Sequence, residues 1–302
     1  MRRSNARTVH MHSLERRKSM WAYLFLLPWF VMFCVFYAYP FVYGIVVSFT
    51  DFTLGSMKWN GLQNYRQIFS DYAFWRSLLG TVCYCAIIIP LEVFIPLWAA
   101  NTLRPHGRVF NTLTKLLFYI PGIVCSVVMV IVWKFILSPG SGLLNDLLIK
   151  LEITGFSIFD QAVTSIPVMS LMIVFTCLGS NLIIYCAAIN GIPAMYYEAA
   201  ELDGATRRQQ FHKVTIPMVH STVIYVLVTS TIATLQVFVI PQLMTGGGPN
   251  YTSSSLLMMI YNSAFVGGQF GYASAIGVML FIITALVAVV QFRIMRRDQI
   301  EY

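Results

Sequence analysis

"EAAELDGATRRQQFHKVTIP", residues 198–217, is a charged stretch in an otherwise apolar chain, and it determines how the rest is interpreted. Three acidic and three basic residues fall within it, so its charges sum to zero. Apolar segments long enough to cross a membrane lie on both sides of it. A compact polar insert between two such segments predicts a loop on one face of a membrane.

The amino-acid composition indicates that most of this chain lies within a membrane. Of its 302 residues, 58% are hydrophobic and 11% are charged, whereas a soluble domain has about a quarter charged residues. The six cysteines lie in apolar stretches without zinc-site spacing, so we expect neither a metal site nor disulfides. No Gly-x-x-x-x-Gly-Lys-Ser/Thr motif is present, so the chain lacks the phosphate-binding loop of an ATPase.

Six segments are apolar enough to cross about 30 Å of hydrocarbon, which needs about 20 residues each. Lys115 and Lys134 flank the third, and the last two share an uncharged stretch, 214–292, interrupted by "TGGGPNYTSSS" (245–255) and "GGQFG" (267–271). The predicted fold class is all-α, a polytopic membrane protein with six transmembrane helices. The predicted spans are 19–50, 77–100, 116–133, 163–189, 219–244 and 273–292.

The predicted organisation is a basic cytoplasmic tail (1–18), a first transmembrane helix with an extracytoplasmic loop (19–76), a five-helix core (77–292) and a cytoplasmic tail (293–302). The core contains a cytoplasmic loop at 190–218. Orientation follows from Lys and Arg, which are enriched on the cytoplasmic side: 15 lie on one side, that of the two tails, the insert and the connection between the second and third spans. The other side has Lys58, Arg66, Arg76, Lys134 and Lys150. This topology accounts for the net charge of +8, so no nucleic-acid partner is invoked.

Local signals predict two short helices within the insert. Pro193 suits a first helical turn, and Gly204 suits a helix stop. Thr206 and Gln209 have capping-box spacing, and Pro217 predicts a kink or restart. Because the charges cancel, the insert suits contact with a protein better than with anionic lipid, which favours strongly basic elements. The alternative is an ordinary interfacial loop.

The insert resembles the "EAA" loop of ABC-importer permeases: Glu-Ala-Ala, three residues, Gly, nine residues, then Ile-x-Leu-Pro. This chain has "EAA" at 198–200, Gly204 and "VTIP" at 214–217, with Val214 and Ile216 as conservative departures. The resemblance implies the transmembrane domain of a type I ABC importer, whose loop is a coupling helix seated in a separate ATPase. It implies ATP-Mg on that partner and no cofactor or catalysis in this chain. The implied coupling residues are Glu198, Ala199, Ala200, Asp203, Gly204 and Pro217.

Further motifs resemble carbohydrate-uptake permeases related to the maltose and glycerol-3-phosphate systems. They are "WNGLQNYRQIF" (59–69), "GLLNDLL" (142–148), "TGGGP" (245–249), "YNSAF" (261–265) and "GYASA" (271–275). This resemblance implies a bacterial plasma (inner) membrane protein and a sugar substrate. It also implies three partners: a second homologous permease, an ATPase dimer and an extracytoplasmic solute-binding protein.

A neutral sugar needs hydroxyl and amide partners along its path. Ser180 and Asn181 in the fourth span, and Ser230 and Thr234 on one face of the fifth, are candidates. Gln236 lies on another face. In the maltose permease the sugar contacts fall on these two spans, and Ser180, Ser230 and Thr234 occupy corresponding positions. The alternative is that these polar groups hold helices together.

Glu92 is the one acid deep within a predicted span. Such carboxylates are functional candidates, but we favour a protonated or paired group at a helix interface. Three alternatives remain: an ABC permease for a non-sugar solute, a secondary transporter in which Glu92 exchanges protons, and a membrane scaffold that transports nothing.

Overall fold

A computed structural model describes residues 23–53, 55–104, 107–138, 142–143 and 162–296. The predicted tail 1–18, Lys150 and Arg297, which entered the orientation argument, lie outside these residues. So does the "GLLNDLL" motif beyond residue 143.

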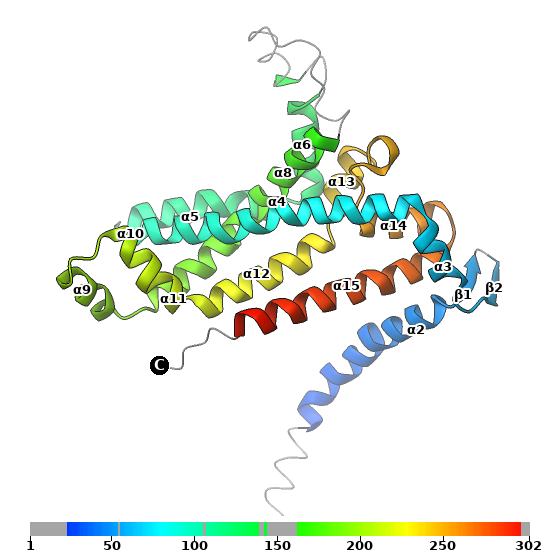
Figure 1. Ribbon diagram of the computed structural model, residues 1–302, viewed down its shortest axis with the longest axis horizontal. Coiled ribbons are helices and arrows are strands. Elements are labelled where there is room, and N and C mark those ends of the chain that lie inside the picture. The colour runs from blue at the N-terminus through cyan, green and yellow to red at the C-terminus, as the bar shows by residue number, and fades with distance from the viewer. Residues whose placement is uncertain (1–22, 54, 105–106, 139–141, 144–161, 297–302) are drawn as a thin grey trace, which may run out of the picture.

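The described residues contain five helices long and apolar enough to cross a membrane, or six if one bent pair counts as a span. They agree with five of the six predicted spans, within a few residues at most ends. Figure 1 shows α4, α5, α8, α12 and α15 running alongside one another, while the first helix diverges from them. The five are the helix Tyr23–Val47 (with η1, Cys34–Ala38, and α2, Tyr39–Val47), α4 (Tyr72–Leu103), α8 (Ala162–Asn190), α12 (His220–Leu235) continued by α13 (Val239–Met244), and α15 (Phe270–Arg296).

The third predicted span, 116–133, is wrong as a single helix. It consists of α5 (Arg108–Ile123) and α6 (Ser126–Ile136), which meet at 93° across two extended residues. Pro121 lacks an N–H to continue the helix, and the following Gly122 has low helix propensity, so the chain breaks shortly after them. Lys115 therefore lies within α5, away from either end, whereas Lys134 lies in the last turn of α6.

A small β-hairpin precedes the second span and was not predicted. β1 (Thr50–Thr53) pairs antiparallel with β2 (Ser56–Trp59), and the short helix α3 (Gln63–Ser70) follows. Asn64 on α3 is buried, and its Nδ2 donates to the carbonyl oxygens of Ser48 at 2.8 Å and Thr50 at 2.9 Å. These bonds fix the hairpin on the end of the first helix, so an otherwise all-α molecule has a β cap at one end (Figure 1).

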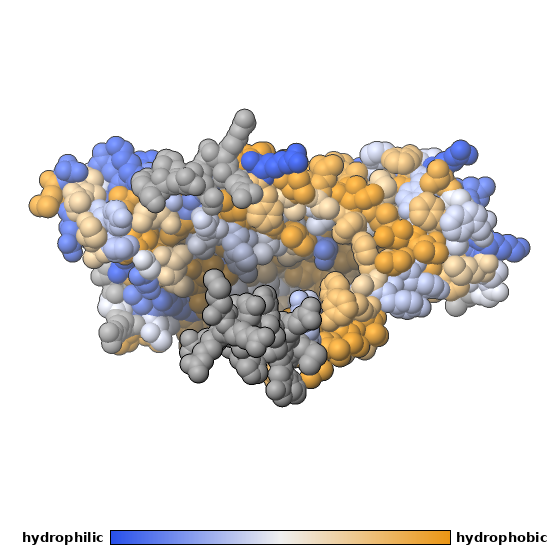
Figure 2. All heavy atoms as spheres, turned by 90° about the horizontal axis from the view of Figure 1, so that it is seen from below, coloured by the Kyte–Doolittle hydropathy of each residue, from blue (hydrophilic) through white to orange (hydrophobic). Residues whose placement is uncertain are grey.

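The core is built around α4, which packs against α8 and α12, while α5 packs on α8 and α15 on α12. Buried side chains form three clusters along the bundle, one near each end and one between them. On the face shown in Figure 2, polar residues gather at the two ends and apolar residues between them. This distribution suits a bundle whose middle lies in hydrocarbon.

The Gly-rich break at 245–255 is present as predicted, but its serines lie inside the bundle. It contains the short η3 (Pro249–Tyr251) and leads into α14 (Leu256–Tyr261) and η4 (Asn262–Val266). Irregular backbone is tolerated at membrane depth when protein surrounds it, and hydroxyls of α4 bind this segment. The bonds are Tyr84 Oη to the Ser253 carbonyl (3.0 Å), Ser77 Oγ to Ser254 Oγ (3.1 Å) and the Leu256 N–H to Thr81 Oγ1 (3.0 Å).

Candidate functional site

The insert forms a helical loop at the end of the bundle opposite the hairpin (Figure 1). It comprises α9 (Ala194–Leu202), α10 (Arg207–Gln210), the π-helical η2 (Phe211–Thr215) and α11 (Ile216–Met218). Gly204 has φ +74°, a conformation that favours glycine, and ends the first helix as predicted. Thr206 and Gln209 form the predicted capping box, and Pro217 stands at the start of the restarted helix.

Tyr197 attaches this loop to the bundle. Its side chain is 3% exposed, and the Arg104 guanidinium lies 3.1 Å from the centre of its ring. Thr215 Oγ1 donates to Asn101 Oδ1 at 3.4 Å, so its remaining lone pairs can accept the Tyr197 hydroxyl at 3.0 Å. One tyrosine thus joins α9, η2 and the C-terminal end of α4.

Sequence reasoning missed all four members of this network, Tyr197, Thr215, Asn101 and Arg104. Two signals were available. Tyr197 directly precedes Glu198 in the motif, and Asn101 and Arg104 are polar residues spaced i, i+3 at the end of a span.

The opposite side of α9 presents an apolar face to its surroundings. Met195, Ala199 and Leu202 are spaced i, i+4, i+7 and therefore share one side of the helix. Met195 is 65% exposed and Leu202 is 91% exposed. Adjoining apolar side chains on a water-facing loop are typical of a surface that another protein covers.

The predicted coupling residues lie mostly at the surface of this loop. Glu198, Ala199, Asp203, Gly204 and Pro217 are exposed, whereas Ala200 is half-buried. They are therefore available to a partner, and their role in coupling stays a prediction.

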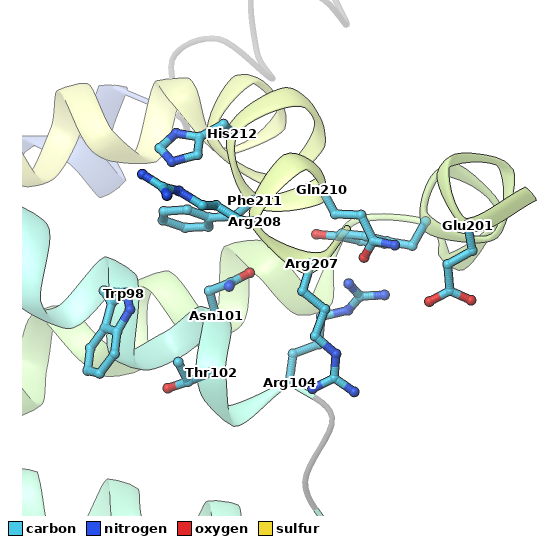
Figure 3. Close-up of a pocket in the computed structure, with 11 residues that line it drawn as sticks. Trp98, Asn101, Thr102, Arg104, Glu201, Arg207, Arg208, Gln210, Phe211 and His212 are labelled. Atoms are coloured by element: carbon cyan, nitrogen blue, oxygen red, sulfur yellow. The ribbon is translucent and has the colours of Figure 1, made fainter. Parts of the chain in front are cut away.

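A groove of about 670 Å³ separates the loop from the C-terminal end of α4. Arg104, Arg207, Arg208 and His212 line it, and Glu201 is the one acid among its described lining residues. In the view of Figure 3, Arg104 and Arg207 lie at one end, whereas Arg208 and His212 lie toward the other, on the side of Trp98. Positive charge therefore gathers in a groove whose neighbouring loop is neutral.

Glu92 lies buried where α4, α8 and α12 meet. Its carboxyl group lies close enough to the side chains of Cys177 on α8 and Ser230 on α12 to interact with both. Asn181 Nδ2 donates to the Glu92 backbone carbonyl at 3.3 Å. Glu92 is thus a paired group at a helix interface, the arrangement that we favoured from the sequence.

The substrate-path candidates do not all come together. Ser230 and Asn181 meet at Glu92, and the buried Thr234 donates to the Ser230 carbonyl at 2.7 Å. Ser180 and Gln236 are exposed. In this conformation Asn181 and Ser230 connect α8 and α12 with Glu92 on α4, whereas the bond of Thr234 lies within α12. Contact of any of the five with a substrate stays a prediction.

Comparison with known proteins identifies the family of this chain. Residues 92–297 match the family described as "Binding-protein-dependent transport system inner membrane component". The chain is 31% identical over 284 residues to the probable ABC transporter permease protein YurN of Bacillus subtilis (strain 168), covering 92% of this chain and 97% of YurN. It is 29% identical over 280 residues to the diacetylchitobiose uptake system permease protein NgcF of Streptomyces coelicolor, covering 88% and 79% respectively.

A solved structure has the same fold. It is that of a bacterial ABC transporter involved in the import of the acidic polysaccharide alginate, with a TM-score of 0.86 at 21% identity, covering 96% of this chain and 99% of that one. The predicted fold class, the transmembrane domain of a type I ABC importer, is thereby confirmed. From the family match over more than half of its length and the aligned permease YurN, the chain belongs to the binding-protein-dependent transport system inner membrane components.

Proposed function

We propose that this chain is one of two permease subunits of an ATP-driven importer and that it lines the path of a sugar across the plasma membrane. Its partners are a homologous second permease, a dimer of ABC ATPase subunits and an extracytoplasmic solute-binding protein. ATP-Mg binds to the ATPase subunits, and this chain carries no cofactor.

The two-sided structure of α9 carries the proposal. One side is fixed to the bundle through Tyr197, while the other exposes Met195, Ala199 and Leu202. A partner that covers the exposed side can therefore push on α9 and move the inner end of α4. Such a push favours one of two bundle arrangements over the other only if the partner binds them with different free energies. ATP binding and release on the ATPase would supply that difference.

The sugar class is supported by the relatives and by the polar side chains of the spans. NgcF is named for uptake of diacetylchitobiose, a neutral saccharide. Ser180 and Gln236 are exposed polar groups on α8 and at the end of α12 that suit hydroxyl-rich solutes. Glu92, the buried acid, has its hydrogen-bond partners within the protein.

In the proposed orientation, the α9 end and both termini lie in the cytoplasm, and the hairpin end lies outside. In this orientation the hairpin, α3 and the exposed side chains Met57 and Trp59 face the binding protein.

Affinity purification of the tagged chain from its native membranes tests the assembly. We expect an ABC ATPase and a second permease to co-purify, and the reconstituted complex with its binding protein to accumulate labelled sugar when ATP is present. Leu202→Arg places a charge on the exposed side of α9 and should release the ATPase. Lys213→Gln, an exposed position in the same loop, is the matched control.

Two results would contradict the proposal. One is a complex without an ATPase. The other is uptake that continues without ATP and stops when the proton gradient collapses, which would favour a secondary transporter.

A further inference from the structure

The groove at the inner end of α4 has a different charge balance from the loop beside it. Within the loop, three acids offset three bases. In the fold Arg104 joins Arg207 and Arg208 at the groove, whereas Glu198 and Asp203 are exposed elsewhere and are not among its described lining residues. Arg104 lies at the end of α4, outside the loop, and therefore adds positive charge to the groove that the neutral loop sequence does not show.

Glu201 lines the groove, but it forms no ion pair with the arginines there. Among the residues that the structure describes, no carboxylate oxygen lies within 4.0 Å of a guanidinium nitrogen of Arg104, Arg207 or Arg208. Arg104 stacks on Tyr197, which leaves the edge of its guanidinium able to donate. Guanidinium groups bind phosphate oxygens in pairs of parallel hydrogen bonds, so this groove suits a phosphate-bearing anion.

An exposed apolar surface leads along α4 into the groove. Phe94 and Trp98 are spaced i, i+4 on one side of α4 and are 66% and 63% exposed. Trp98 also lines the groove and lies about one turn before the end of α4 at Leu103. Tryptophan is enriched at the level of lipid headgroups, so the groove lies where a headgroup would be, with hydrocarbon beside Phe94.

We propose that this groove binds the phosphate of an anionic phospholipid of the inner leaflet, whose acyl chain lies against Phe94 and Trp98. Basic pockets between transmembrane helices on the cytoplasmic side are typical headgroup sites. The inference rests on the orientation in the proposed function. The bound phosphate bridges Arg104 at the end of α4 and Arg207 on α10, with Arg208 adding positive charge on the side of Trp98, and so holds the loop against the bundle. Inorganic phosphate shares the headgroup chemistry but not the apolar contact.

Lipid binding to the purified full-length chain tests this site without the ATPase or any transport assay. The chain, stripped of lipid in detergent, is titrated with phosphatidylglycerol, phosphatidylcholine or inorganic phosphate, and bound ligand is measured by native mass spectrometry. We expect a clear preference for phosphatidylglycerol. Each basic group contributes about a factor of five, so Arg207→Gln together with Arg208→Gln should weaken binding roughly thirty-fold.

The controls distinguish lipid binding in this groove from general electrostatic attraction between the anionic lipid and basic residues elsewhere on the protein. Arg293→Gln removes an exposed arginine from the last turns of α15, outside the groove, and should leave binding unchanged. Lysine at both 207 and 208 keeps the charge and should retain most of the binding. If the double glutamine variant unfolds, each single variant, with about a fivefold expected loss, provides the same test.

Three results would overturn the inference. They are equal binding of the two lipids by the wild type, an equal loss in Arg293→Gln, and inorganic phosphate binding as tightly as phosphatidylglycerol. The last result would make the groove a site for a soluble anion. Because the ATPase is absent, none of these results depends on whether the chain transports a sugar.

Discussion

Tyr197 shows how much of the loop's attachment depends on one side chain. It contacts Arg104 on its ring face and Thr215 at its hydroxyl, and Thr215 in turn bonds Asn101. The capping box, the Gly204 stop and the Pro217 restart were predictable because each depends on residues within a few positions. The bond between Thr215 and Asn101 was not, because it joins residues 114 positions apart whose proximity depends on the packing of whole helices.

Two substitutions of Tyr197 distinguish the contribution of its hydrogen bond to stability from the contribution of its ring contacts. Tyr197→Phe removes one hydrogen bond and should lower the free energy of unfolding by about 1 kcal/mol. Tyr197→Ala also removes the buried ring and should lower it by about 3–5 kcal/mol. Thermal unfolding in detergent measures both changes. Tyr196→Phe, at the exposed neighbouring position, is the control, and an equal effect there would argue against the network.

Glu92 offers a residue-scale test between ATP-driven transport and proton exchange. Glu92→Gln keeps the shape and the hydrogen-bonding capacity toward Ser230 and Cys177, so we expect ATP-driven uptake to persist. Glu92→Lys replaces the acidic group by a basic one at membrane depth and should lower the free energy of unfolding by about 2.5–3.5 kcal/mol. Uptake and unfolding temperature are measured on the same preparations. Loss of uptake in a stable Glu92→Gln protein would favour a proton-exchange role.

Among the elements, the third span departs most from prediction. Hydropathy predicts a membrane-length segment but does not distinguish a straight helix from a broken one. Pro121 and Gly122 were the available signal for the break. The packing of Gly122 on α8 could not be predicted, since it depends on the arrangement of two separate helices. A Cβ at Gly122 would lie 2.7 Å from the Thr176 carbonyl oxygen.

A larger residue at position 122 should push α5 away from α8. Gly122→Val should lower the free energy of unfolding by about 1–3 kcal/mol, the usual range for overpacking. Gly277→Ala in α15 is the matched control, because a Cβ there has no neighbour within 4 Å. Unfolding temperature in detergent, and the fraction eluting as a single species, measure the difference. Equal effects of the two substitutions would show that the contact between α5 and α8 is looser than described.

At the scale of the whole molecule, the two polar ends and the apolar middle follow from hydropathy and were predictable. The hairpin was not, because its four-residue strands give too short an alternating pattern beside long apolar helices. The burial of the serine segment behind "TGGGP" was also missed. Serines and glycines indicate a loop, and its place inside the bundle depends on bonds to hydroxyls of α4 and to the Val237 carbonyl, which lie far away in the sequence.

Orientation is tested with one cysteine at each end. Leu202→Cys on α9 should react with a membrane-impermeant maleimide only in inside-out vesicles, and Met57→Cys on the hairpin only in right-side-out vesicles. Both positions are exposed. The unchanged protein, whose described cysteines lie largely in membrane helices, provides the background. The reverse pattern would place the loop outside and remove the basis for an ATPase partner.

The attachment at Tyr197 also indicates how a movement of the loop can be transmitted along α4 to the other end of the bundle. Its contacts end on the C-terminal end of α4, a helix of 32 residues, about 48 Å long at 1.5 Å per residue. At the N-terminal end, Asp71 caps the same helix and accepts the Tyr272 hydroxyl of α15 at 2.6 Å. One helix therefore connects the two ends of the bundle. Pro90 and Pro96 remove backbone hydrogen bonds within it, so we expect α4 to bend first in its C-terminal half when the loop moves.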